Sequence, residues 1–366
     1  MQSPKITVLG AGSFFFGRPV IWNMVTSEVL KSGTLALVDT NPGVLKTMMR
    51  LAERAIEATG APCKLIGSTD RKEVMGNSDF IVTTFSDRNA HFRGLDTQIS
   101  AKYGVRMCSS DTIGPGGVFR ALREMPTLMA MTKDAEELAP NAWFVNFVNP
   151  TSVLGIALMR YSDIRSFAIC DGPPEPHHRL RALKQVGILC DDAKSIPSEV
   201  EQRLDYRVAG VNHFTWLLRF DYDGKDYLPK FREVLAERAA DERKEVDRTA
   251  FDANSYSKAK FNASYSLALW DLFGSYPDTI GHTKEYLPFF QGLGITANEP
   301  ESLVLFDAED RKGKMTARFA ETEEFAAGKK PIAEFIENGT SDHATDIIES
   351  MWGGLGKSFY INSANN

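Results

Sequence analysis

The sequence predicts an α/β fold in which a doubly wound parallel sheet is followed by a second domain of α+β type. Short apolar segments alternate with amphipathic segments up to about residue 190, and the first apolar segment runs directly into a glycine turn. After residue 191, two longer strand-like segments and a charged helix replace this alternation. We therefore expect one domain at residues 1–190 and another at residues 191–366.

The composition argues against several classes of protein. The chain has 366 residues, and its hydrophobic content of 43% and charged content of 25% are ordinary for a globular protein. A net charge of -6 argues against nucleic acid as a partner. The four cysteines follow neither a disulfide framework nor a zinc-finger spacing, which favours a cytoplasmic location. Residues 1–16 are typical of a strand and a turn rather than of a signal peptide. No apolar run is long enough to span a membrane, so we expect no membrane association.

The first predicted strand, residues 5–9, and the turn after it indicate a dinucleotide site. Gly10 permits a tight turn, and Gly12 lets backbone amides approach a pyrophosphate at the start of the next helix. The third glycine of the usual dinucleotide pattern is absent, because a phenylalanine stands there. The residues of this turn that we expect to contact the nucleotide are Gly10, Gly12, Ser13, Phe14 and Phe15.

The second strand, residues 35–38, indicates which dinucleotide would bind. It ends in Asp39, at about the distance from the glycine turn where a carboxylate receives the ribose hydroxyls of the adenosine. An acid there would repel a 2′-phosphate, so the sequence favours NAD over NADP; a glycine turn that binds no nucleotide is the alternative. Thr84 and Asn146, near the ends of two further predicted strands, complete the predicted cofactor contacts.

Polar segments follow the later strands at the crevice edge of the predicted sheet. Arg88 lies in the segment after the strand at residues 79–85. Residues 110–123 combine clustered glycines with Asp111 and lead into a helix, which brings backbone amides and an acid close to a ligand. Asn149 follows the strand at residues 142–148 and places an amide at the same edge.

A cysteine and a histidine far apart in the chain suggest a metal site. Cys170 ends an apolar run before a Pro-Pro turn, and His213 follows another apolar run and a glycine. A thiolate and an imidazole that meet in a cleft form part of a metal site with open coordination positions. Taken alone, each residue also fits a core position, as a small buried hydrophobe or a hydrogen-bonded histidine.

Together these segments resemble glycoside hydrolase family 4, the NAD- and metal-dependent glycosidases. The segments 111–117 (Asp-Thr-Ile-Gly-Pro-Gly-Gly) and 212–216 (Asn-His-Phe-Thr-Trp) carry the resemblance most specifically. The others, in family order, are 5–13, 118–123, 146–150, 170–171 and 282–286. The resemblance implies a Rossmann-type domain followed by an α+β domain for substrate binding and oligomerisation, as in lactate and malate dehydrogenases, and a homodimer or homotetramer. Family members usually continue beyond residue 366, so it also implies either a short form or a missing tail.

The resemblance implies NAD+- and Mn2+-dependent hydrolysis of a glycoside. In such a reaction, oxidation at carbon 3 is followed by loss of the carbon 2 proton, elimination of the aglycone, addition of water and re-reduction. By position, Cys170 and His213 would hold the metal, Asp111 would assist the leaving group, and Asn149 would bind the substrate.

The sequence departs from the family where the carbon 2 base is expected, because Ile280 and Gly281 stand there. The candidate bases nearby are Asp278, Tyr276 and His282.

The residue after the predicted metal cysteine indicates the substrate class. Within the family, Asp171 at this position favours an α-glycoside with an anionic group on carbon 6, which can be a phosphate, a carboxylate or the sulfonate of a sulfoquinovoside. Guanidinium groups suit such oxyanions, and we expect them from Arg88, Arg93 and Arg120.

Two other functions fit the same nucleotide fold. An NAD-dependent dehydrogenase of a hydroxy acid or a sugar would release NADH in step with its product. A non-catalytic nucleotide sensor would have no use for a thiolate–imidazole pair.

Overall fold

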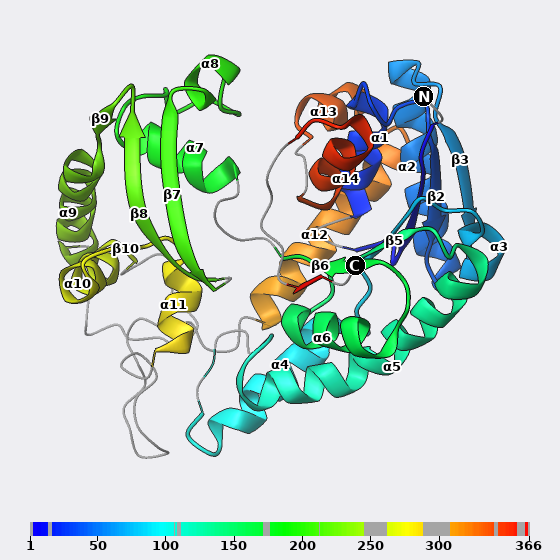
Figure 1. Ribbon diagram of the computed structural model, residues 1–366, viewed down its shortest axis with the longest axis horizontal. Helices are drawn as coiled ribbons and strands as arrows, with labels where there is room; N and C mark the ends of the chain where they lie inside the picture. Colours follow the sequence, from blue (N-terminus) through cyan, green and yellow to red (C-terminus); the bar gives the residue numbers. More distant parts are fainter. Residues whose placement is uncertain are drawn as a thin grey trace. The chain divides into compact units, whose positions relative to one another are not determined.

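The computed structural model of the protein describes residues 3–13, 17–105, 107, 111–170, 176–211, 213–244, 262–287, 308–339, 343–356 and 363–364 (Figure 1). The chain divides into two compact units. Unit 1 contains Met1–Asp96, Ser110–Cys170 and Ala308–Asn366, and unit 2 contains Thr97–Ser109 and Asp171–Asp307. None of the helices in the described ranges is long and apolar enough to cross a membrane.

Unit 1 is built on a seven-stranded sheet with the order β11-β6-β5-β4-β1-β2-β3. Strands β1 to β6 run parallel, and β11 pairs antiparallel with β6. The chain proceeds from β1 to β3 and then returns to β4 on the other side of β1, so the strand order reverses there. This is the predicted doubly wound parallel sheet, and the fold class is confirmed. The strands are β1 (Lys5–Leu9), β2 (Thr34–Val38), β3 (Lys64–Ser68), β4 (Phe80–Thr83), β5 (Trp143–Asn146), β6 (Ser166–Ala168) and β11 (Ser363–Ala364).

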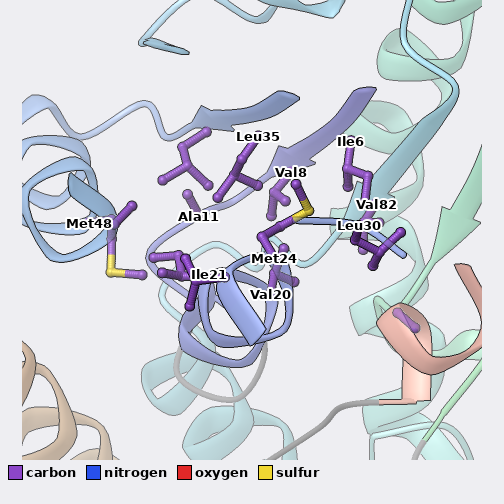
Figure 2. Close-up of a cluster of buried hydrophobic side chains, with 14 of the residues drawn as sticks. Ile6, Val8, Ala11, Val20, Ile21, Met24, Leu30, Leu35, Met48 and Val82 are labelled. Atoms are coloured by element: carbon purple, nitrogen blue, oxygen red, sulfur yellow. The ribbon is translucent and has the colours of Figure 1, made fainter. Parts of the chain in front are cut away.

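Apolar cores lie on both faces of this sheet. On one face, Ile6 and Leu35 of the strands pack with Ile21 and Met24 of α1 (Gly17–Thr26), and these side chains are almost completely buried (Figure 2). The same core includes α2 (Pro42–Thr59). On the other face, the core joins the sheet to α3 (Arg71–Met75), α5 (Gly114–Leu138) and α6 (Thr151–Tyr161). Helix α4 (Asn89–Ala101) follows β4.

Three C-terminal helices belong to unit 1: α12 (Ala308–Ala326), α13 (Ile332–Glu337) and α14 (His343–Gly353). Phe325 and Ile348 lie in the same core cluster as α1 and α2. The Trp22 indole donates a hydrogen bond to the Ile336 carbonyl at 2.6 Å. The compact units therefore differ from the predicted division at residues 190 and 191, because these late helices bury apolar side chains against the first part of the chain.

The sequence indicates a helix that starts at Pro126, but α5 begins earlier, at Gly114, and runs through that proline. Pro126 has no amide hydrogen and cannot donate to the carbonyl of Leu122, which costs helix stability. Burial of Leu128, Met131 and Ala135 against the sheet offsets this cost.

Unit 2 contains a four-stranded sheet in which β8 pairs with β7, β9 and β10. The pairings are antiparallel, as expected of an α+β domain. Its strands are β7 (Leu204–Val211), β8 (Phe214–Tyr222), β9 (Lys225–Asp226) and β10 (Tyr276–Pro277). Its helices are α7 (Pro176–Gln185), α8 (Ser198–Glu201), α9 (Leu228–Lys244), α10 (Asn262–Phe273) and α11 (Ile280–Tyr286).

The segment at residues 276–288 reads in the sequence as a loop closing over a site, because polar groups alternate there with Pro and Gly. The structure instead forms strand β10 and helix α11 in it. Ring packing of Tyr276 against Phe231 and Trp270 holds the strand in the core of unit 2.

Candidate active site

The predicted nucleotide residues of unit 1 lie at one edge of its sheet. Gly10 follows β1, Asp39 follows β2, Thr84 follows β4, and Asn146 ends β5. Parallel strands present their carboxyl ends at the same edge, and sheets of this type bind ligands where the strand order reverses, which here is between β1 and β4.

The glycine turn has the tight backbone that a dinucleotide requires. Gly10 has φ +94°, and a Cβ atom on it would lie 2.7 Å from the Phe85 nitrogen, so other residues do not fit. A Cβ on Gly12 would overlap the Val44 side chain. The Gly12 amide donates to Asp39 Oδ2 at 2.9 Å, which fixes the carboxylate beside the turn. These features fit NAD; Phe14 and Phe15 lie outside the described residues.

Thr84 and Asn146 brace this edge of the sheet. The Thr84 hydroxyl donates to the Gly10 carbonyl at 2.7 Å. Asn146 is fully buried, donates from Nδ2 to the Val148 carbonyl and accepts at Oδ1 from the Thr83 hydroxyl. The described contacts of Asn146 are thus internal to unit 1, and its contact with the cofactor stays a prediction.

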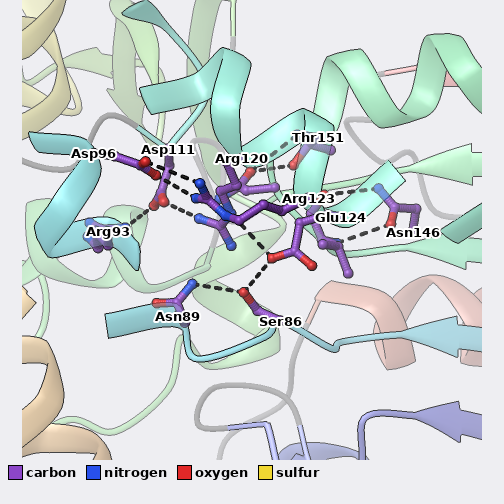
Figure 3. Close-up of polar contacts among 12 residues, drawn as sticks. Ser86, Asn89, Arg93, Asp96, Asp111, Arg120, Arg123, Glu124, Asn146 and Thr151 are labelled. Atoms are coloured by element: carbon purple, nitrogen blue, oxygen red, sulfur yellow. Dashed lines mark hydrogen bonds and ion pairs between the residues drawn. The ribbon is translucent and has the colours of Figure 1, made fainter. Parts of the chain in front are cut away.

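Asp111 lies in an ion-pair cluster of unit 1 (Figure 3). One carboxylate oxygen accepts from Arg93 Nη1 and the other from Arg120 Nη1, and both arginine side chains are buried. Burial alone would raise the pKa of Asp111, but the Arg120 and Arg93 guanidiniums outweigh burial and hold the pKa well below its usual range. In this arrangement Asp111 is a carboxylate without a proton to donate at neutral pH.

The three predicted substrate arginines differ in their surroundings. Arg93 and Arg120 contact Asp111, whereas the side chain of Arg88 is 66% exposed. The Arg88 guanidinium lies 4.8 Å from the centre of the Phe92 ring, and its Nε lies 3.6 Å from the Asp87 carboxylate. Arg88 is therefore the member of the three that the structure presents to solvent.

Asn149, another predicted substrate residue, lies just after β5. Asn149 Oδ1 accepts hydrogen bonds from the backbone amide and the hydroxyl of Thr151, at 3.3 and 2.7 Å. These bonds fix the orientation of the amide at the start of α6. Asp171 lies outside the described residues.

The two predicted metal ligands lie in different compact units. Cys170 is half-buried and follows β6 of unit 1, as expected. In unit 2, His213 lies between β7 and β8 and has φ +60°, an uncommon conformation for a residue with a side chain. Among the described residues, no group of three or more His, Cys, Asp or Glu side chains could hold a metal. A thiol and an imidazole fit a divalent ion chemically, and the shared site stays a prediction.

The three candidate bases all lie in unit 2. The His282 ring lies 4.5 Å from the His213 ring, centre to centre, and stacks on Tyr286. Tyr276 is buried, and burial raises the pKa of its phenol, which opposes a role as phenolate base.

Asp278 is the third candidate and lies in a buried polar cluster. Its Oδ1 accepts from the Tyr206 hydroxyl at 3.3 Å and lies 3.5 Å from His178 Nδ1. Its Oδ2 is buried and has no hydrogen-bond partner among the described residues. The carboxyl group of Asp278 is thus a buried hydrogen-bond acceptor.

Sequence reasoning missed several members of these clusters. His178 reads as part of a solvated loop pair, but it lies on α7 and is 8% exposed. Tyr206 belongs to no recognisable sequence motif, so its contact with Asp278 could not be predicted. In unit 1, Glu124 and Ser86 extend the Asp111 cluster, and for Glu124 a signal exists, because it follows Arg120 by four residues on α5.

Sequence comparison identifies the family. The sequence model described as family 4 glycosyl hydrolase matches residues 5–196, and that of the family 4 glycosyl hydrolase C-terminal domain matches residues 208–366. An α-galactosidase of Bacillus subtilis (strain 168) is 30% identical over 299 residues, 81% of this chain and 61% of that protein. An α-galacturonidase of Thermoanaerobacter italicus is 27% identical over 79% of this chain and 61% of that protein.

Solved structures agree in fold. A 6-phospho-α-glucosidase from gut microorganisms, crystallised with NAD and Mn2+, has a TM-score of 0.70 and 19% identity over 98% of this chain and 77% of that one. The chain spans less than two thirds of the length of the two curated relatives named above. Since the two sequence models match most of its residues, the chain belongs to glycosyl hydrolase family 4.

Proposed function

We propose that the protein is an NAD+- and Mn2+-dependent glycoside hydrolase that cleaves an α-glycoside by oxidation at carbon 3, deprotonation at carbon 2, elimination, water addition and re-reduction. The observation that carries the proposal is the match of both family sequence models to a chain in which the Gly12 amide of the glycine turn is hydrogen-bonded to Asp39. NAD and Mn2+ are bound in the 6-phospho-α-glucosidase that shares this fold.

Each predicted site residue has a role in this reaction. The turn at Gly10 and Gly12 binds the dinucleotide, and Asp39 receives its ribose. Cys170 and His213 would hold the ion. When bound, NAD+ supplies a hydride acceptor and the ion a Lewis acid.

The base and the acid of the reaction are both buried carboxylates in this proposal. Asp278 accepts the carbon 2 proton, with Tyr276 and His282 as the alternatives. Asp111 assists departure of the aglycone. Because two guanidiniums oppose protonation of Asp111, this role requires that the bound sugar weakens the ion pairs with Arg93 and Arg120.

We propose a substrate with an anionic group at carbon 6, a 6-phosphoglucoside, a uronide or a sulfoquinovoside. Arg88 is the exposed guanidinium available to meet such a group. The names of two similar proteins, an α-galacturonidase and a 6-phospho-α-glucosidase, support this class, whereas the α-galactosidase supports a neutral sugar. A homodimer or homotetramer in the cytoplasm remains our prediction for the assembly and its location.

A panel of 4-nitrophenyl glycosides, neutral and anionic at carbon 6, tests the proposal with NAD+, Mn2+ and a reductant present. We expect many turnovers per NAD+ and no net NADH. NADH formed in step with product would instead show the alternative function, an NAD-dependent dehydrogenase of a hydroxy acid or a sugar.

A further inference from the structure

A second buried carboxylate, that of Glu124 on α5, lies next to the Asp111 cluster (Figure 3). Its side chain is 5% exposed, and its Oε1 accepts a hydrogen bond from the Ser86 hydroxyl at 2.7 Å. Ser86 follows β4 and accepts in turn from the Asn89 amide at 3.2 Å. Glu124 therefore links α5 to the loop at the carboxyl end of β4.

The same oxygen of Glu124 lies 4.0 Å from Nε of Arg120. Arg120 uses Nη1 to contact Asp111, and its Nε is buried without a hydrogen-bond partner in the described part of the chain. Glu124 is thus the second carboxylate of Arg120. The connected groups Arg93, Asp111, Arg120 and Glu124 carry two positive and two negative formal charges.

Stability alone does not explain a charged group at this position. Burial raises the pKa of Glu124, and the Ser86 hydroxyl, Arg120 and Arg123 offset only part of this effect, while Asp87 adds to it. A carboxyl whose pKa is raised by folding stabilises the folded state at low pH and loses that contribution as the pH rises through the folded pKa. At neutral pH and above, a neutral side chain of the same shape would cost less.

We propose that Glu124 is a positioning residue that fixes the Arg120 guanidinium, and through it the Asp111 carboxylate, relative to the β4 end of the predicted nucleotide edge. The inference rests on the proposed function, in which Asp111 assists the leaving group. It adds to that function a specific mechanical link, Ser86–Glu124–Arg120–Asp111, contained within unit 1.

The variant Glu124→Gln tests this link, because it keeps the shape and the acceptor for Ser86 but removes the charge that faces Arg120. We expect kcat to fall about tenfold, as for a small displacement of a reacting group, with KM changed less than about twofold. The matched control is Glu136→Gln on the same helix, where Glu136 accepts from the Ser162 hydroxyl at 2.5 Å. The control should leave kcat unchanged. Equal kcat losses in both variants, or none in Glu124→Gln, would overturn the proposal.

A second measurement needs no activity and separates this inference from the proposed function. Thermal unfolding midpoints at pH 8 are compared for the wild type, Glu124→Gln, Asp111→Asn and the double variant. Glu124→Gln alone should leave the midpoint unchanged or raise it. In the Asp111→Asn background, where Arg120 has lost its other carboxylate, Glu124→Gln should lower the midpoint. The shifts in midpoint caused by the two substitutions are then not additive. Additive midpoints would contradict the link, whereas a wild type that hydrolyses no glycoside would contradict only the proposed function.

Discussion

The two units each hold a buried carboxylate of the proposed reaction, and they hold it by different means. Asp111 of unit 1 is bound by two guanidiniums, whereas Asp278 of unit 2 accepts from the Tyr206 hydroxyl and lies near His178. The two guanidiniums hold the pKa of Asp111 well below its usual range, whereas the printed hydrogen-bond donor to Asp278 is a neutral hydroxyl. Environments that differ in this way are how two carboxyl groups acquire different roles in one enzyme.

The variant Asp111→Asn should produce the largest effect, because it removes the carboxylate that two buried guanidiniums, those of Arg93 and Arg120, both contact. We expect activity to fall about 10³-fold and the free energy of unfolding to fall by about 3 kcal/mol at pH 7. The folded pKa of Asp111 is below the unfolded value of about 3.9, so the ion pairs stabilise the protein above about pH 4 and this contribution is lost as the pH falls further. Urea unfolding of both proteins from pH 8 to pH 3 measures the difference.

Asp134→Asn is the matched control for Asp111. Asp134 lies on the same helix, α5, as Arg120 and is also paired with two cations, Arg71 at 2.7 Å and Lys72 at 2.9 Å. It is not one of the predicted site residues. The Asp134→Asn variant should keep full activity. A stability difference between Asp111→Asn and the wild type that stayed constant from pH 8 to pH 3 would show that the ion pairs are not its cause.

Metal binding tests whether the two units contribute to one site. Cys170→Ser and His213→Ala should each weaken Mn2+ binding at least about 100-fold. The double variant should bind Mn2+ no more weakly than either single variant, because loss of one ligand already removes the site. Titration of Mn2+ followed by electron paramagnetic resonance measures this. Cys190→Ser is the control, since Cys190 is exposed in unit 2.

The buried Cys63 should not react with a thiol-alkylating reagent at pH 8. Burial raises the pKa of its thiol to about 11, so little of the reactive thiolate is present at that pH.

Arg88→Gln separates an exposed arginine from the two that contact Asp111. If Arg88 meets the group on carbon 6, KM for an anionic glycoside should rise about tenfold, while KM for its neutral analogue and the unfolding midpoint stay unchanged. Arg50→Gln, on the exposed face of α2, is the control. An equal rise in KM for both sugars would remove Arg88 from anion recognition.

Tyr206→Phe should have the smallest effect. It removes the hydroxyl that donates to Asp278 and should lower the free energy of unfolding by about 1 kcal/mol. If Asp278 is the base, loss of the hydroxyl that holds its carboxyl group should also lower kcat. A kcat equal to that of the wild type would count against Asp278 as the base and leave His282 and Tyr276.

The sequence predicts well what depends on local chain chemistry. The glycine turn, Asp39 and Cys170 lie at the ends of their strands as expected, because apolar runs and the turn residues after them determine those positions. The fold class and the family are confirmed.

Partners that meet only through tertiary packing could not be predicted in the same way. Nothing near His178 or Tyr206 in sequence reveals that both approach Asp278. The contact of Glu124 with Ser86 joins residues 38 positions apart. Pro126 misleads for a related reason, because burial of the surrounding helix outweighs the local cost of the proline.

The docking of α12 to α14 on the first helices has a consequence for biosynthesis. Strands β1 to β6 leave the ribosome long before Phe325 and Ile348, which belong to the same apolar core as α1. Until those residues are translated, the apolar side chains that they cover in the folded protein stay exposed to solvent. During that interval the nascent chain must be protected from aggregation.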